Sequence, residues 1–418
     1  MCRLDTADRY AYFPSHTTHA QGVSLSRPAG SSKLLRVMNE SAAFAHLLDP
    51  GNLTRADLRR LTALSTPTIS EVLRRLTGAG LVSVVGFNSG RPGPNAEIYS
   101  ANPDAAWTAA VSVRDIGASH APSLVASVSD LTGTVRAHVE RSVDFLHADP
   151  VDAIAGVVAD LRSRTGAPAG RIRQVQIGVA GSYDPRSGVI HHVEVPGLGR
   201  TGLVPEIAER LGTRVDVDND VNLAAVAERR HGAGRGADGF ALLWLGADGL
   251  GLAIDIGGTL MRGARGGAGE IGYMPLWSPD PAGHAKTALQ DVVGGPAVLS
   301  LAGEHGIRAA TPPEAVAAAA TDPARHSVFF AQLADRVSIG LAAVIAVLDP
   351  TMVVLAGEVG QAGGKPLRDA VAAALARNTT LQAAIELTAL TDDAVLQGAQ
   401  VTGVTTIRES LLDQISDA

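Results

Sequence analysis

The sequence predicts an α/β protein in which a winged helix-turn-helix module precedes a two-lobed body with mixed sheets. Two short amphipathic helical segments and a strand–loop–strand segment lie within residues 31–104 and predict the module. Beyond residue 105, apolar strands alternate with helices, a pattern typical of mixed sheets covered by helices. With 418 residues, the chain is also long enough for about two or three domains.

These patterns divide the chain into consecutive segments. Residues 1–30 lack the long apolar core of a secretory signal and are expected to be a disordered leader. The remaining segments are the module at 31–104, a first lobe at 105–221, a second lobe at 222–397 and a C-terminal helix at about 398–418, which we expect to return to the first lobe.

Composition limits the classes of protein that the chain can belong to. Apolar residues make up 46% and aromatic residues 4%, and no apolar run approaches the roughly 18 residues of a membrane span. The longest candidate, "IGLAAVIAVLDP", ends in Asp-Pro and predicts a core helix. Cys2 is the single cysteine, which excludes an intramolecular disulfide and a cysteine-based zinc site within one chain. We expect a cytoplasmic protein with no membrane partner.

Charge is distributed unequally along the chain. Residues 1–100 hold 11 Lys and Arg against 7 Asp and Glu, and the other 318 residues hold 24 against 35. A basic N-terminal module on an acidic body is expected when only one part of a protein meets a polyanion such as DNA.

The segment from Leu53 to Gly80 has the features of a helix-turn-helix. Thr54 and Asp57 have the spacing of a capping box at the start of the first helix. The second helix is expected to begin near Pro67 and to end at Gly78 and Gly80. Its predicted apolar face consists of Ile69, Val72, Leu73 and Leu76. Upstream, "SKLLRVMNESAAFAHLL" predicts a further amphipathic helix that packs on the module.

A wing follows the second helix and supplies a further candidate DNA contact. "LVSVV" and "AEIYS" flank the loop "GFNSGRPGPN", which carries Arg91 at its tip. Arginines and small hydroxyls suit phosphates and base edges, respectively. The candidate DNA-binding residues are Arg55, Arg59, Ser65, Thr66, Thr68, Ser70, Arg74, Arg75 and Arg91. The alternative is that this module serves only in dimerisation or packing.

Several motifs follow one another in the body: "GVAGSYDPRSGVI", "VPGL", "VDVDNDVNLAAVAERRHGAGRG", "LLWLGADGLGLAIDIGGTLMRGARGGAGEIGYMP" and "LDPTMVVLAGEV". With these motifs the body resembles the ROK family (repressors, open reading frames and sugar kinases) over about residues 105–410. The resemblance implies an actin-like ATPase, or sugar-kinase, fold. The winged helix-turn-helix in front of this body is similar to that of the repressor branch of the family.

Asp220 is the residue on which kinase chemistry would depend. In the family, the base that deprotonates the sugar hydroxyl is the aspartate of an Asn-Asp step, which corresponds here to Asn219 and Asp220 in "DNDVN". The resemblance therefore implies Asn219 as a sugar contact and Asp220 as the base of an active kinase. The alternative is that Asp220 is a helix N-cap.

Two glycine-containing loops are the candidates for binding nucleotide phosphates. The first is "DIGAS", with Asp115, Gly117 and Ser119, in a hairpin longer than the family's form. The second is "LGADGLG", with Gly246, Gly249 and Gly251, which could equally be plain hairpin glycines. ATP and Mg²⁺ are expected only if the chain is a kinase.

Two substitutions and a missing loop separate this chain from the family's kinases. Glu194 stands where the kinases have a sugar-binding Asn, and Tyr273 replaces the histidine that contacts sugar and ligates zinc. The cysteine-rich zinc loop is missing, and His284 alone cannot complete a tetrahedral site. We predict no metal and no cofactor. The residues predicted to bind a sugar-type effector are Glu194, Asn219, Asp220, Glu270 and Tyr273, to which the adjacent His191 and His192 could be added.

A second Asp-x-Gly-Gly-Thr run, Asp255 to Thr259, resembles a kinase phosphate loop but lies too far along the chain. It follows the strand of the second glycine loop, where the family has a hairpin turn. Gly257 and Gly258 are therefore predicted to be turn glycines, and Asp255 is not expected to bind phosphate.

The predicted function is transcriptional regulation, with the chain acting as a repressor of genes for carbohydrate uptake or use. We expect a homodimer or tetramer whose winged helices bind a duplex operator and whose cleft binds a sugar or sugar derivative. One alternative is an active hexose kinase that carries a DNA-binding domain. Another is a regulator without an effector, in which the body is a dimerisation scaffold.

Overall fold

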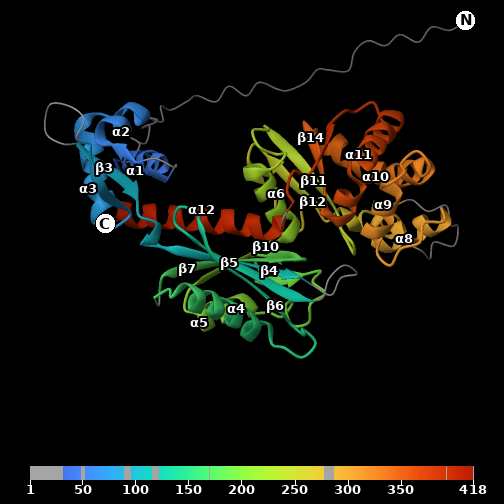
Figure 1. Ribbon diagram of the computed structural model, residues 1–418, viewed down its shortest axis with the longest axis horizontal. Coiled ribbons are helices and arrows are strands. Elements are labelled where there is room, and N and C mark those ends of the chain that lie inside the picture. Colours follow the sequence, from blue (N-terminus) through green and yellow to red (C-terminus); the bar gives the residue numbers. More distant parts are fainter. Residues whose placement is uncertain are drawn as a thin grey trace, which may run out of the picture.

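The computed structural model describes residues 32–48, 52–88, 96–114, 122–168, 170–276, 287–391 and 393–417. It has a small N-terminal module and two α/β lobes, and the long C-terminal helix α12 (Ala394–Asp417) runs between them (Figure 1). The predicted fold class is confirmed. Arg91, Asp115, Gly117, Ser119 and His284 lie outside the described residues.

The N-terminal module combines helices with a small antiparallel sheet. Its helices are α1 (Ser32–Leu48), α2 (Arg55–Thr62) and α3 (Thr66–Gly78). Its strands are β1 (Leu53–Thr54), β2 (Val82–Asn88) and β3 (Ala96–Ala101), in the order β1-β3-β2. The buried face of α3 consists of Ile69, Val72, Leu73 and Leu76, as the spacing predicted.

Local capping sets the positions of α2 and α3. Thr54 and Asp57 form the predicted capping box at the start of α2. Ala63, in the left-handed conformation, ends α2, and the Ser65 side chain caps α3 by accepting from the Thr68 N–H. These caps leave a turn of residues 63–65 between the helices, the geometry of a helix-turn-helix.

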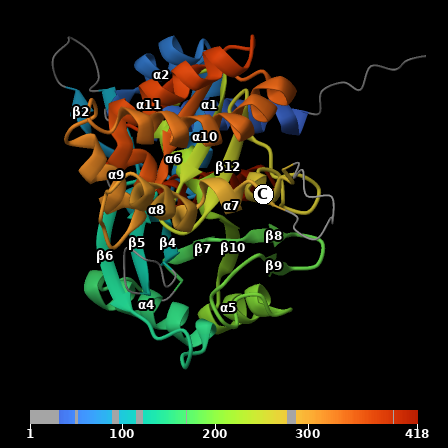
Figure 2. The same cartoon turned by 90° about the vertical axis from the view of Figure 1, so that its right-hand side faces the viewer.

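The first lobe is a mixed five-stranded sheet in the order β10-β7-β4-β5-β6. Its strands are β4 (Trp107–Arg114), β5 (Ser123–Asp130), β6 (Val135–Ser142), β7 (Ile172–Val179) and β10 (Arg214–Asn219). Helices α4 (Pro150–Thr165) and α5 (Leu203–Leu211) cover one face (Figure 2), and α12 packs on the other. A short hairpin, β8 (Ser182–Asp184) with β9 (Val189–His191), lies at the edge of the lobe.

The second lobe has a sheet in the order β13-β12-β11-β14-β15. Its strands are β11 (Gly239–Leu245), β12 (Leu250–Ile256), β13 (Thr259–Leu260), β14 (Met352–Ala356) and β15 (Ala384–Leu387). Helices α7 (Gln290–Val293), α8 (Gly295–Glu304), α9 (Pro312–Ala320), α10 (Ser327–Leu348) and α11 (Gly357–Asn378) cover one face. Helix α6 (Asp220–His231) packs on the other face and also contacts α12.

Helix α10 is the one described helix that is long and apolar enough to cross a membrane. Phe329, Leu333, Val337 and Leu341 on this helix are instead buried in the core of the second lobe. The segment predicted to be a core helix therefore has that position in the fold.

Helix α12 connects all three parts of the chain. Near its N-terminus it packs on α6 and on the first-lobe sheet, and near its C-terminus it packs on α1. Ile407, Leu411 and Ile415 join the hydrophobic core of the N-terminal module. Figure 1 shows α12 extending from beneath α6 to the module.

Candidate functional site

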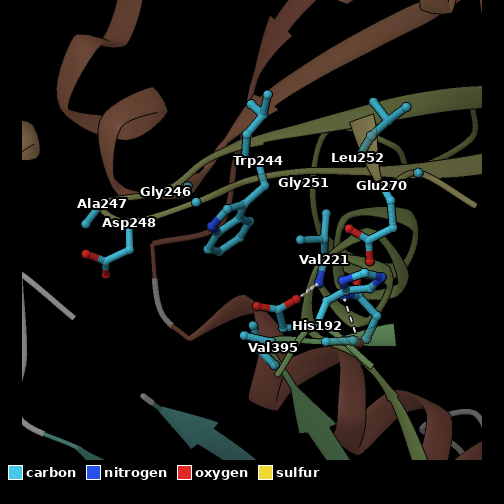
Figure 3. Close-up of a pocket in the computed structure, with 18 of the residues that line it drawn as sticks. His192, Val221, Trp244, Gly246, Ala247, Asp248, Gly251, Leu252, Glu270 and Val395 are labelled. Carbon is cyan, nitrogen blue, oxygen red and sulfur yellow. Dashed lines mark hydrogen bonds between the residues drawn. The ribbon is translucent and has the colours of Figure 1, made fainter. Parts of the chain in front are cut away.

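A cavity of about 490 Å³ lies between the two lobes, a size typical of small-molecule sites. The first lobe contributes the ends of β4, β9 and β10, and the second contributes the β11–β12 turn and residues 266–273. All five predicted effector residues line it: Glu194, Asn219, Asp220, Glu270 and Tyr273. Figure 3 shows the indole of Trp244 projecting into this cavity near Asp248 and Val221.

Asn219 and Asp220 stand where strand β10 runs into helix α6. The side chain of Asn219 caps α6 by accepting from the Asn222 N–H at 3.1 Å, and its amide donates to the Gly181 carbonyl at 3.2 Å. Asp220 is the first residue of the helix. The alternative that Asp220 is the N-cap is therefore wrong, because Asn219 occupies that position. The Asp220 carboxylate remains available to the cavity.

The pKa of Asp220 is raised to about 7, mainly by burial and also by the nearby carboxylates of Glu358 and Glu270. The Val221 N–H, which donates to Asp220 at 2.8 Å, opposes this shift only in part. Near neutral pH, Asp220 can therefore donate a proton to a ligand hydroxyl or accept one from it.

The raised pKa of Asp220 predicts how stability depends on pH. The folded state binds the Asp220 proton more tightly than the unfolded chain does. The stabilisation of the folded state by this proton is therefore fully present below about pH 4 and is lost as pH rises through about 7. The stability of the Asp220→Asn variant should not show this decrease with pH, because asparagine does not titrate. Its stability relative to the parent should therefore increase by on the order of 2 kcal/mol between pH 5 and 8.

Urea unfolding at several pH values measures this difference. The Asp238→Asn variant, altered at an exposed position, is the matched control and should show no such trend. A constant difference between Asp220→Asn and the parent over this range would contradict the raised pKa.

Glu270 and Tyr273 form the wall that the second lobe contributes. Glu270 accepts a hydrogen bond from the Ser182 hydroxyl of the first lobe, so this contact crosses the cleft. Burial raises the pKa of Tyr273, with a further contribution from the carboxylates of Glu270 and Glu194. The Tyr273 ring packs against His192, with ring centroids 4.8 Å apart.

His192 is part of the cavity wall. Its backbone has a φ of 55°, which is uncommon for a residue other than glycine. Such conformations are concentrated at functional sites. Figure 3 shows its imidazole beside the carboxylate of Glu270. The sequence suggested His192 only as a neighbour of Glu194, whereas the structure places both residues in the same wall.

The second glycine loop is a tight turn between β11 and β12. The Gly246 N–H donates to the Gly249 carbonyl at 2.9 Å, and the Ala247 N–H donates to the Glu358 carboxylate at 3.3 Å. At Gly251, a Cβ atom would meet the Val221 side chain at 2.6 Å. Hairpin packing therefore accounts for Gly246 and Gly251, whereas a Cβ atom at Gly249 would meet no neighbour. An acidic side chain already uses one of the amides that a phosphate would need.

Carboxylates dominate the charge of the cavity. The described lining contains six of them: Glu194, Asp220, Asp248, Glu270, Glu358 and Asp393. Arg114 is the one arginine or lysine in that lining, and it is engaged by Asp393 at 2.7 Å and by Glu140 at 3.3 Å. Among the described lining residues no free arginine or lysine would offset the charge of a polyphosphate, so this part of the cavity favours neutral polyhydroxyl ligands.

The sequence did not single out Trp244, Asp248, Glu358 or Asp393 as effector-binding residues, and Ser182 joins the site through its hydrogen bond to Glu270. Trp244, Asp248 and Glu358 lie in motifs that carry the family resemblance, but only the fold brings them to one cavity. The position of Glu358 directly after β14 is a further signal, since ligand sites gather at the carboxyl ends of strands.

Asp255 lies away from the cavity and has a structural role. It is buried and pairs with Arg229, whose Nε donates to it at 3.1 Å. It also accepts from the Gly258 N–H at 2.9 Å. Gly257 and Gly258 have φ of 59° and 82°, which a type I′ turn requires. The prediction that they are turn glycines is confirmed.

Metal ligands do not cluster in the part of the chain that the structure describes. No group of three or more His, Cys, Asp and Glu side chains there is arranged to hold a metal ion.

The start of α3 presents the predicted base-reading side chains. Ser65 and Thr66 are exposed, and Thr68 and Ser70 are half-buried. The exposed Arg59 donates to the Thr66 hydroxyl at 3.3 Å, so α2 and α3 meet at this surface. The Arg55 guanidinium donates to Glu97 and to the Tyr99 hydroxyl, and Arg74 forms an ion pair with Glu71.

The prediction that Arg75 contacts a DNA phosphate is corrected by the position of its side chain. Its side chain is turned inward, where its Nε lies 2.7 Å from the fully buried carboxylate of Glu40. It also donates to the Ile415 carbonyl at 2.5 Å. Arg75 therefore joins α3 to α1 and α12, and its side chain is not exposed as a phosphate contact would be.

Comparisons with known proteins agree with this architecture. The chain is similar to the xylose repressor of Caldicellulosiruptor bescii, with 22% identity over 78% of this chain and 84% of that protein. It is also similar to the glucokinase of Thermotoga maritima, with 29% identity over 53% of this chain and 75% of that protein. A crystal structure of a ROK family transcriptional regulator, a homologue of the Escherichia coli MLC protein, superposes with a TM-score of 0.71.

That regulator is 18% identical, and the superposition covers 92% of this chain and all of the regulator, so the likeness extends over the N-terminal module as well as both lobes. The ROK family description matches residues 115–403, more than half of the chain. The chain therefore belongs to the ROK family.

Proposed function

We propose that the protein is a cytoplasmic DNA-binding transcriptional regulator that represses genes for carbohydrate uptake or use. The observation that carries this proposal is the course of α12, one continuous helix from the inter-lobe cavity to the N-terminal module. The fold shared with a ROK regulator and the similarity to a xylose repressor also support it.

Helix α12 provides a physical path from the cavity to the DNA-binding surface. Ala394 and Val395 at its start line the cavity, whereas Leu411 and Ile415 near its end are buried against the module. A helix of 24 residues spans about 36 Å. Because the helix is unbroken, a displacement at one end changes the position of the other.

The packing of α12 on α6 makes the path responsive to a ligand. Gly398 allows α12 to approach so closely that a Cβ atom there would overlap the Leu223 carbonyl of α6. Helix α6 begins with Asp220 in the cavity, and the far end of α12 accepts from Arg75 of α3. A ligand that moves the start of α6 would therefore also move α12 and α3.

The proposed mechanism is a change in affinity between two states. A dimer presents two α3 helices to half-sites of a pseudo-palindromic operator. A sugar in the cleft changes lobe closure and, through α12, the spacing of these helices. This coupling requires that the sugar bind the DNA-competent and DNA-incompetent states with different affinity.

The effector that the cavity chemistry supports is an uncharged sugar. Titration calorimetry of the full chain with neutral hexoses and pentoses should identify a ligand, and Glu270→Gln should weaken its binding about tenfold. Arg308→Gln, at an exposed position, is the control and should bind normally. The same ligand should change operator affinity in an anisotropy titration.

Two results would contradict this mechanism. Operator affinity that is unchanged by every ligand that measurably binds would exclude effector control. The absence of any sugar ligand would favour the body as a dimerisation scaffold.

A second candidate function is hexose phosphorylation, favoured by Asp220. Its raised pKa and its place in the cavity suit a general base, whereas the surrounding carboxylates and the engaged Ala247 N–H oppose nucleotide binding. A coupled ATP-consumption assay over a hexose panel distinguishes the two functions. Sugar-dependent turnover that Asp220→Asn abolishes would establish the kinase.

A further inference from the structure

A second cavity, of about 700 Å³, lies at the junction between the N-terminal module and the first lobe. Its walls are the C-terminal end of α3, the connecting residues Asn102 to Ala105, the start of β7 and the C-terminal part of α12. A molecule bound there would touch the module and the body at the same time. We refer to it as the junction cavity.

The charge of the junction cavity is opposite to that of the inter-lobe cavity. Four arginines line it, Arg74, Arg75, Arg171 and Arg173, against the single carboxylate of Asp104. Arg75 is neutralised by Glu40, and Arg74 pairs with Glu71 on the surface. Asp104 accepts from the Trp107 indole at 3.2 Å.

Arg171 and Arg173 supply the unneutralised charge. Within the described ranges, neither guanidinium makes a hydrogen bond or an ion pair, although each lines the same hollow. Two guanidinium groups in the lining of one cavity suit the several oxygens of a phosphate group, which a guanidinium can contact in bidentate fashion. The amide of Gln414 is an additional donor in this wall.

The predicted base-reading residues and the junction cavity lie at opposite ends of α3. The predicted base-reading residues Thr66 to Ser70 lie in the N-terminal part of α3, about 12 to 18 Å along the helix from Gly78 at its other end. The C-terminal end of α3 is packed against α12 through the contact of Arg75 with Ile415. Arg171 and Arg173 therefore lie at the other end of α3 from the predicted base-reading residues.

We propose that the junction cavity binds the phosphate group of a small phosphorylated metabolite, with Arg171 and Arg173 as its principal ligands and Arg74 as a third from the module. Such a ligand would tie α3 to β7 and would hold the module in one orientation on the body. If the ligand prefers one orientation of the module, it also changes operator binding. This effect on operator binding rests on the proposed function. Binding itself does not depend on that function.

The test is titration calorimetry of the full-length chain at constant ionic strength with glucose 6-phosphate, inorganic phosphate and glucose. We expect the two phosphate compounds to bind, and Arg171→Gln combined with Arg173→Gln to weaken them at least tenfold. Arg308→Gln, which alters an exposed arginine outside both cavities, should leave them unchanged. Tighter binding of glucose 6-phosphate than of inorganic phosphate would identify an ester as the ligand, and equal binding would identify free phosphate.

Three outcomes would overturn the proposal. The first is that no phosphate compound binds, and the second is that the double variant binds like the parent while Glu270→Gln does not, which would place the phosphate in the inter-lobe cavity. The third is that the double variant loses DNA affinity without any phosphate binding in the parent, which would assign the arginines to the DNA interface. If the double variant fails to fold, Arg173→Gln alone, at an exposed position, should weaken binding about threefold.

Discussion

Replacing Asp255 with alanine should lower the free energy of unfolding by about 3 kcal/mol, because the substitution leaves Arg229 without its buried partner. The Gly258 N–H loses its acceptor as well, so the turn between β12 and β13 should loosen. Urea unfolding of the parent and the variant measures the difference. The residue that most resembles a phosphate-loop aspartate would then be required for stability.

Asp369→Ala is the matched control for this prediction. Asp369 also pairs with an arginine, Arg368, but its side chain is exposed, so its loss should cost less than about 1 kcal/mol. Equal effects of the two substitutions would contradict the structural role of Asp255. Normal stability of Asp255→Ala combined with impaired ATP binding would restore its interpretation as a phosphate ligand.

Replacing Arg59 and Thr68 together with alanine should lower operator affinity about 100-fold, because one side chain is expected to contact phosphate and the other a base edge. Both belong to the surface at the start of α3, where Arg59 bonds Thr66 and Thr68 bonds Ser65. Fluorescence anisotropy with an operator duplex at several salt concentrations measures the loss. The slope against log salt should also decrease by about 1, because one phosphate contact is removed.

Arg308→Ala, an exposed arginine on the second lobe, is the control for charge alone and should bind the operator normally. Because Thr68 also contributes to the cap of α3, circular dichroism should first establish that the double variant is folded. A folded double variant with unchanged operator affinity would contradict the assignment of this surface.

Local patterns in the sequence predicted most of the secondary structure. The capping box at Thr54, the apolar face of α3 and the glycine turn at Gly257 depend on residues within a few positions of one another. Such features are set by backbone geometry and by side-chain periodicity, which a single sequence displays. The two lobes were also evident from the alternation of strands and helices.

Long-range pairings could not be predicted in this way. The helical spacing places Arg75 on the polar face of α3, where a DNA contact is expected. Only tertiary packing brings it to Glu40 and Ile415. In the same way, Glu358 and Asp393 join Asp220 in one cavity although they lie far apart in the chain. The sequence therefore predicted three of the six carboxylates of the cavity, Glu194, Asp220 and Glu270, and only the fold adds the other three.

Genome-wide mapping of the DNA sites that the protein binds tests the central claim most directly. If the protein is an operator-binding regulator, it should enrich a small set of inverted-repeat sites beside genes for carbohydrate uptake or use, and the cognate sugar should change that enrichment. No enrichment above bulk DNA, together with sugar-dependent consumption of ATP, would contradict the claim and would identify the protein as a kinase.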